Sequence, residues 1–87
     1  MTWRIEYTGN AKKTLQKLDK TVSRRIVGKM DNVAKLEDPR SIGKRLVGNF
    51  AGYWRYRVGD YRIICNIDDG NLLVLVIEIN HRSKIYN

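Results

Sequence analysis

Several residue types are scarce in this sequence, and each scarcity excludes a class of structure or chemistry. The 87 residues include one cysteine, Cys65, and one histidine, His81. An internal disulfide is therefore excluded, and so is a structural zinc site, which needs four protein ligands. The longest apolar run, residues 72–77, is far shorter than the roughly 20 residues of a membrane-spanning helix. Because the first residues contain no basic run followed by an apolar core, no signal peptide is expected, and the sequence predicts a cytoplasmic protein.

Positive charge is what the chain has in excess. Seventeen Lys and Arg residues against nine Asp and Glu residues give a net charge of +8. The excess is not confined to a tail, because residues 40–87 contain eight cationic and four acidic side chains. A basic domain of this kind predicts a polyanionic partner.

Residues 53–65 are the most informative segment, because arginines alternate there with aromatic and β-branched residues. The pair Gly59-Asp60 is a two-residue turn signal, and a turn at this point places Arg57 opposite Arg62. Strand alternation then puts one set on the apolar face: Trp54, Tyr56, Val58, Tyr61, Ile63 and Cys65. The other face carries Arg55, Arg57 and Arg62. Like charges opposite one another destabilise a strand pair, so we interpret this face as a site for an anion.

The rest of the chain predicts a single α+β domain over residues 1–87 with the order β-α-α-β-β-β. A strand is expected at 3–7, a helical hairpin at 11–18 and 22–36, and a loop at 41–52. A buried strand follows at 72–79, completing a three-stranded antiparallel meander in a twisted, mainly antiparallel sheet. Trp3, Trp54 and Cys65 are predicted to lie in the core. The helix cations are predicted to be solvated: Lys12, Lys13, Lys17, Arg24, Arg25 and Lys29.

Three segments, taken in order, resemble the RelE/ParE superfamily of bacterial and archaeal toxins. They are the loop GKRLVG at 43–48, the hairpin YWRYRVGDYR at 53–62 and the ending HRSKIY at 81–86. The resemblance covers essentially the whole chain. It implies a cofactor-free, metal-independent endoribonuclease that cleaves mRNA in the ribosomal A site, in the cytoplasm of a bacterium or archaeon. It also implies that the partners are mRNA, the ribosome with its 16S rRNA, and a co-expressed RelB-like antitoxin that forms a hetero-oligomer with the toxin.

The resemblance also implies catalytic residues. Arg62 matches the strand arginine that similar toxins place on the scissile phosphate, and Arg82 matches their second arginine. Tyr86 matches a C-terminal tyrosine that stacks on a base or takes part in proton transfer. His81 is the side chain whose ordinary pKa suits acid–base work near neutrality, although strand alternation directs it away from Arg82. The alternatives are structural: an ion pair for either arginine, ring packing for Tyr86 and a surface role for His81.

Four further cations are expected to contact RNA. Arg55 and Arg57 occupy positions where some similar toxins carry lysines, and arginine does not give up its proton. We therefore interpret both as phosphate clamps rather than as an acid or base. Lys44 and Arg45 lie in the basic loop that similar toxins use to grip ribosomal RNA, through salt-sensitive phosphate contacts. A solvated face is the alternative for these cations.

Two other functions compete with the RNA-cleaving toxin. A ParE-like toxin has the same fold but poisons DNA gyrase by binding it, without cutting RNA. A basic nucleic-acid-binding module without catalysis is the second competitor. The set Arg62, Arg82 and Tyr86 favours the nuclease, because an RNA-cleaving enzyme needs these side chains and a gyrase binder does not.

Overall fold

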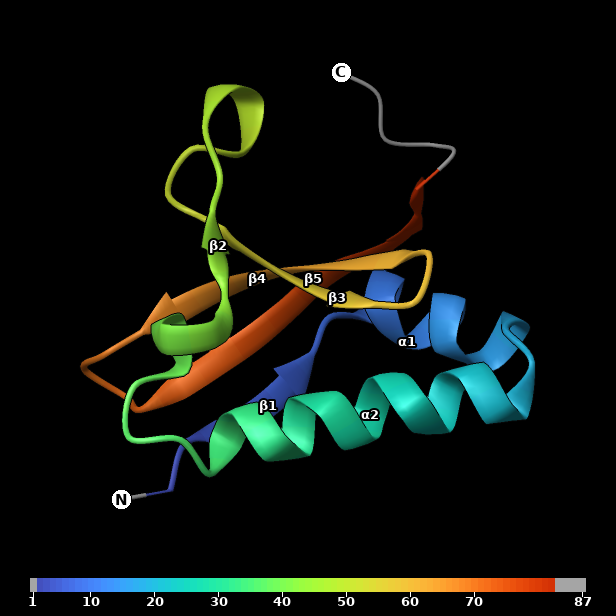
Figure 1. Cartoon of the computed structure of the whole chain (residues 1–87), viewed down its shortest axis with the longest axis horizontal. Coiled ribbons are helices and arrows are strands. Elements are labelled where there is room, and N and C mark those ends of the chain that lie inside the picture. Colours follow the sequence, from blue (N-terminus) through green and yellow to red (C-terminus); the bar gives the residue numbers. More distant parts are fainter. Residues whose placement is uncertain (1, 83–87) are drawn as a thin grey trace.

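The computed structural model describes residues 2–82, and this part of the chain forms one sheet with two helices packed on one of its faces (Figure 1). The strand order is β1-β5-β4-β3-β2, and the predicted α+β class is confirmed. No helix among the described residues is long and apolar enough to cross a membrane. The elements are β1 (Arg4–Tyr7), α1 (Gly9–Lys17), α2 (Lys20–Ala34), β2 (Lys44–Arg45), β3 (Trp54–Val58), β4 (Tyr61–Asp68) and β5 (Leu73–His81), with 3-10 helices η1 (Pro39–Ile42) and η2 (Gly48–Phe50).

Both helices begin at a side-chain cap. The Thr8 hydroxyl accepts a hydrogen bond from the Ala11 N–H at 3.2 Å, and the Asp19 carboxylate accepts one from the Thr21 N–H at 2.7 Å. These caps satisfy backbone donors that a helix leaves unpaired in its first turn. The predicted helical hairpin is confirmed. Each helix begins two residues before the expected start, because its cap precedes the first apolar position.

The predicted meander and its register are also confirmed. Val58 pairs with Tyr61 and Arg57 with Arg62 across a turn in which Gly59 has a φ of +56°, a conformation that favours glycine. Strand β5 is an interior strand of the sheet and lies between β4, to which it is antiparallel, and β1, to which it is parallel. Val74, Val76 and Ile79 of this strand lie in the core, whereas its other residues are only partly buried.

The core lies between the helices and the sheet and contains Trp3 and Cys65, as predicted. Burial raises the pKa of the Cys65 thiol well above its ordinary value. The expectation for Trp54 is wrong: its ring is only half-buried and lies outside this core. The Arg40 guanidinium lies over the Trp54 ring, 5.9 Å from the ring centroid, and is held there by Asp69 at 2.6 Å.

The segment expected to be a loop at 41–52 has structure of its own. Strand β2 pairs with only two residues of β3, and η2 follows it; together they project from the sheet (Figure 1). The buried Tyr56 hydroxyl anchors the base of this projection by donating a 2.6 Å hydrogen bond to the Pro39 carbonyl. The sequence signal for β2 was weak, because a two-residue strand shows no periodicity.

Candidate active site

Arg55, Arg57 and Arg62 share the sheet face that the helices leave uncovered, as the hairpin register predicts. Each residue pairs with partners whose side chains share its face, so the register defines two rows across the sheet. One row is Arg57, Arg62 and Asn80, and the other is Lys44, Arg55, Ile64 and Glu78. The strands thus bring four cationic side chains to one surface.

Among the described residues, these arginines lack acidic partners. Within residues 2–82, none of Arg55, Arg57 and Arg62 forms an ion pair. The Nε atoms of Arg55 and Arg62 are buried and have no hydrogen-bond partner among the described residues. Burial lowers the pKa of Arg55, and the nearby charges of Arg57 and Arg62 lower it further. A buried donor left unpaired costs about 1–3 kcal/mol, a cost that a bound anion would remove.

Arg82 joins two of these arginines around a cavity of about 120 Å³. The cavity is lined by Arg57, Gly59, Asp60, Tyr61, Arg62 and Arg82. Arg82 is fixed by its backbone N–H, which donates to the Asp60 carbonyl at 2.7 Å, and its Nε lies 3.8 Å from an Asp60 carboxylate oxygen. Arginines of β3, of β4 and of the position after β5 therefore line one cavity.

Asp60 is a site residue that the sequence analysis did not single out. It lines the cavity, and its carboxylate pairs with Arg82 but, within residues 2–82, with none of the strand arginines. The signal in the sequence was its role as a turn residue two positions before Arg62. Its contact with Arg82 depends on the return of β5 to the same end of the sheet, which the local sequence does not specify.

His81 lies on the other face of the sheet. It pairs with Tyr61, and the two rings meet edge to face with their centroids 5.1 Å apart. Its side chain lines cavities on the helix side, beside Val22 and Arg25. The structure therefore does not bring His81 together with Arg62. Tyr86 lies outside the described residues.

The basic pair of the loop is divided between the two faces. Lys44 pairs with Arg55 and shares the arginine face, whereas Arg45 pairs with Trp54 and points to the other side. Both side chains are exposed. Of the predicted RNA contacts, Lys44, Arg55 and Arg57 thus share one surface, and Arg45 does not.

Three guanidinium groups around a small cavity suit a phosphate group. Each arginine can donate two parallel hydrogen bonds to phosphate oxygens, and each stays protonated at any physiological pH. The protein therefore belongs to the class of small basic α+β domains whose exposed sheet face carries a cluster of arginines.

Comparison with known proteins identifies the family. Residues 5–86 match the model of the ParE toxin of type II toxin-antitoxin systems, parDE, and the chain belongs to this family of toxins. It is 30% identical over 86 residues to Toxin RelG of Mycobacterium tuberculosis, covering 99% of this chain and 98% of that protein.

Solved structures agree with this assignment. The toxin–antitoxin complex RelBE2 of Mycobacterium tuberculosis contains a chain that is similar with a TM-score of 0.84 and 26% identity, covering 97% of this chain and 95% of that one. The archaeal RelE–RelB complex of Pyrococcus horikoshii gives a TM-score of 0.75 and 25% identity, covering 98% and 100%. The family model is named for ParE, whereas these relatives are named RelG and RelE, which are the two kinds of toxin considered from the sequence.

Proposed function

We propose that this protein is a ribosome-dependent endoribonuclease that cleaves mRNA in the A site, and that a RelB-like antitoxin neutralises it. The observation that carries the proposal is the convergence of Arg57, Arg62 and Arg82 on one cavity, from three separate segments. Gyrase binding does not require a phosphate-sized cavity lined by guanidinium groups. The antitoxin partner is supported by the relatives, whose structures were solved as RelBE2 and RelE–RelB complexes.

In the proposed reaction, the ribose 2′-oxygen attacks the adjacent phosphorus, and the bond to the 5′-oxygen breaks. The products are a 2′,3′-cyclic phosphate and a free 5′-hydroxyl, and one proton leaves the 2′-oxygen while another reaches the 5′-oxygen. Negative charge grows on the phosphate oxygens in the transition state, where Arg62 and Arg82 stabilise it. Fixed charges of this kind are each worth about 10²–10³ in rate.

The other predicted residues take supporting roles in this proposal. Arg55 and Arg57 hold neighbouring phosphates, and Lys44 extends the cationic surface toward ribosomal RNA, with Arg45 reaching RNA from the other side of β2. Tyr86 remains the proposed stacking or proton-transferring residue. His81 contributes to catalysis only if its ring leaves Tyr61, because in the described arrangement it faces the helices.

A ParE-like gyrase poison is the second candidate, because the matching family model is that of ParE toxins. The two functions separate in one experiment with wild-type protein, Arg62→Ala and the control Arg24→Ala, which removes an exposed arginine of α2. Each protein is added to a cell-free translation reaction, and mRNA 5′ ends are mapped by primer extension. A parallel reaction measures gyrase supercoiling.

The nuclease proposal expects A-site cleavage by wild-type protein and by Arg24→Ala, and a loss of about 100-fold or more in Arg62→Ala. Gyrase activity should not change in any reaction. Inhibited supercoiling with intact mRNA would establish the ParE-like function instead. Equal cleavage by Arg62→Ala and wild type would show that the arginine cavity does not take part in cleavage.

A further inference from the structure

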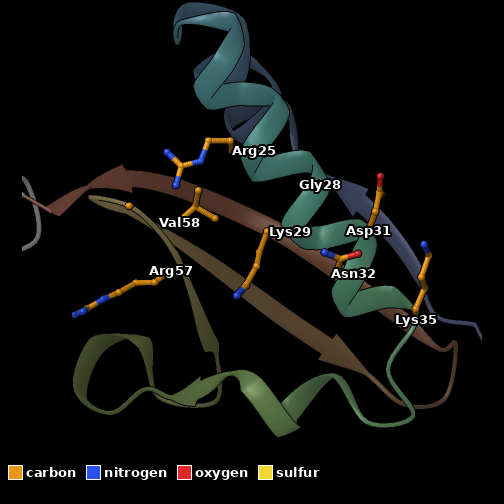
Figure 2. A pocket seen from close by; sticks show the side chains of 9 residues that line it. Arg25, Gly28, Lys29, Asp31, Asn32, Lys35, Arg57 and Val58 are labelled. Carbon is orange, nitrogen blue, oxygen red and sulfur yellow. The ribbon is translucent and has the colours of Figure 1, made fainter.

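A second cationic space lies beside the arginine cavity. A groove of about 650 Å³ runs between α2 and the outer edge of β3. Figure 2 shows Arg25 and Lys29 reaching from α2 toward β3, whereas the side chain of Arg57 extends from β3 away from α2. The groove is lined by four cations, Arg25, Lys29, Lys35 and Arg57, and by one carboxylate, Asp31, together with Gly28, Asn32, Val58 and Gly59. Its charge therefore favours an acidic occupant.

The β3 wall of this groove is an open strand edge. Strand β2 pairs only with Trp54 and Arg55, so within residues 2–82 no strand lies beside the rest of this edge. The Tyr53 carbonyl accepts a 3.0 Å hydrogen bond from the Leu46 N–H, so the backbone N–H and C=O of Tyr53 point away from β4. Because the pattern repeats every two residues, the N–H and C=O of Arg57 also point away from β4.

We infer that an extended acidic segment of the antitoxin binds in this groove and adds a strand to the outer edge of β3. The backbone of an added strand supplies an acceptor for the Arg57 N–H and a donor for the Arg57 C=O, at the spacing of a β-sheet. Carboxylates at alternate positions of the segment then face Arg25 and Lys29. A nucleic acid would match the charge but not the alternating donor and acceptor of the edge. The inference rests on the antitoxin partnership proposed above and is independent of RNA cleavage.

The groove and the arginine cavity share a wall. Arg57 and Gly59 line both spaces, which meet at the turn of the hairpin. Because Arg57 lines both spaces, a segment bound along its backbone in the groove changes the position of Arg57 and weakens its contact with a phosphate in the cavity. When the groove is occupied, Arg57 holds a phosphate in the cavity less tightly. The antitoxin thus inhibits the toxin without entering the cavity itself.

The test compares two charge-matched double variants of α2. The first variant, Arg25→Glu with Lys29→Glu, reverses the charge of two residues that line the groove. The control, Lys20→Glu with Arg24→Glu, reverses the charge of two exposed residues of α2 that do not line it. Affinity for the antitoxin encoded beside the toxin gene is measured by calorimetry, and translation inhibition is measured without antitoxin. Far-UV circular dichroism checks that both variants fold.

The groove variant should bind the antitoxin about 10–100-fold more weakly than wild type, with translation inhibition unchanged, while the control keeps its affinity. Weaker translation inhibition with full antitoxin affinity would make the groove an RNA contact and overturn the inference. Equal losses of antitoxin affinity in the two variants would show only a long-range effect of net charge and would refute the inference. Unchanged affinity in both variants would also refute it.

A measurement on wild-type protein tests the strand addition directly, whatever the variants do. The backbone amide of Arg57 should exchange with solvent rapidly in the free toxin and become protected by at least about 10-fold when antitoxin is bound. The amide of Val58, which faces β4, serves as the internal reference. An Arg57 amide that exchanges equally fast in both states would exclude an added strand.

Discussion

Replacing Arg62 with glutamine should make the protein more stable and less active at the same time. Arg62 lies directly opposite Arg57, and its charge also lowers the pKa of Arg55, so it takes part in two repulsions. A like-charge pair across a strand costs about 0.2–1 kcal/mol, and the Nε of Arg62 is in addition buried with no hydrogen-bond partner in the part of the chain that the structure describes. Glutamine keeps part of the side-chain stem and removes the charge.

We expect the free energy of unfolding to rise by about 0.5–1.5 kcal/mol, which corresponds to a rise in melting temperature of about 4–8 °C per kcal/mol in a domain of this size. The activity proposed above should fall by about 10²–10³. Urea denaturation followed by circular dichroism gives the first quantity, and cell-free translation gives the second. Added salt should shrink the gain in stability, because salt screens the repulsion that the substitution removes.

The control is Arg24→Gln on the exposed surface of α2, which should change neither quantity. A loss of stability of more than about 1 kcal/mol in Arg62→Gln would show that the arginine is a structural residue and would refute the argument. A gain in stability with full activity would keep the electrostatic account and reject the role of Arg62 in catalysis.

Two further predictions concern the core. Tyr56→Phe should lower the free energy of unfolding by about 1–3 kcal/mol, measured by urea denaturation, because it leaves the Pro39 carbonyl without its buried 2.6 Å hydrogen bond; an unchanged value would mean that water replaces the hydroxyl. Cys65 is buried and its thiol pKa is raised, so the thiolate that reacts with iodoacetamide is scarce in the folded protein. Labelling of Cys65 at neutral pH should therefore follow unfolding in urea, and rapid labelling without urea would contradict the described packing.

The parts of the site that depend on local pattern were predictable from the sequence. Alternation around Gly59-Asp60 determines which side chains share a face, so the register of the hairpin and the grouping of Arg55, Arg57 and Arg62 followed without a structure. Burial of β5 followed from its apolar run in the same way. Local periodicity therefore specified most of the sheet and the arginine face.

The parts that depend on contacts between distant segments were not predictable. The position of Arg82 is set by its hydrogen bond to Asp60, which forms only when β5 returns beside the hairpin turn. Arg25 and Lys29 were expected to be solvated helix residues, because nothing in α2 indicates that a strand edge lies opposite them. The side chain of Trp54 fits the alternation of β3, yet the core does not reach it.

The place of β5 between β1 and β4 has a consequence for synthesis. Among the strands of residues 2–82, β1 is the first to be made, and its only strand neighbour there is β5, the last to be made. A nascent chain that ends before β5 holds an unpaired first strand and a hairpin without Arg82. Such long-range pairing is slow to form, and here it postpones assembly of the arginine cavity until translation of the strands is complete. Because of this strand order, the arginine cavity is not assembled while the strands are still being translated.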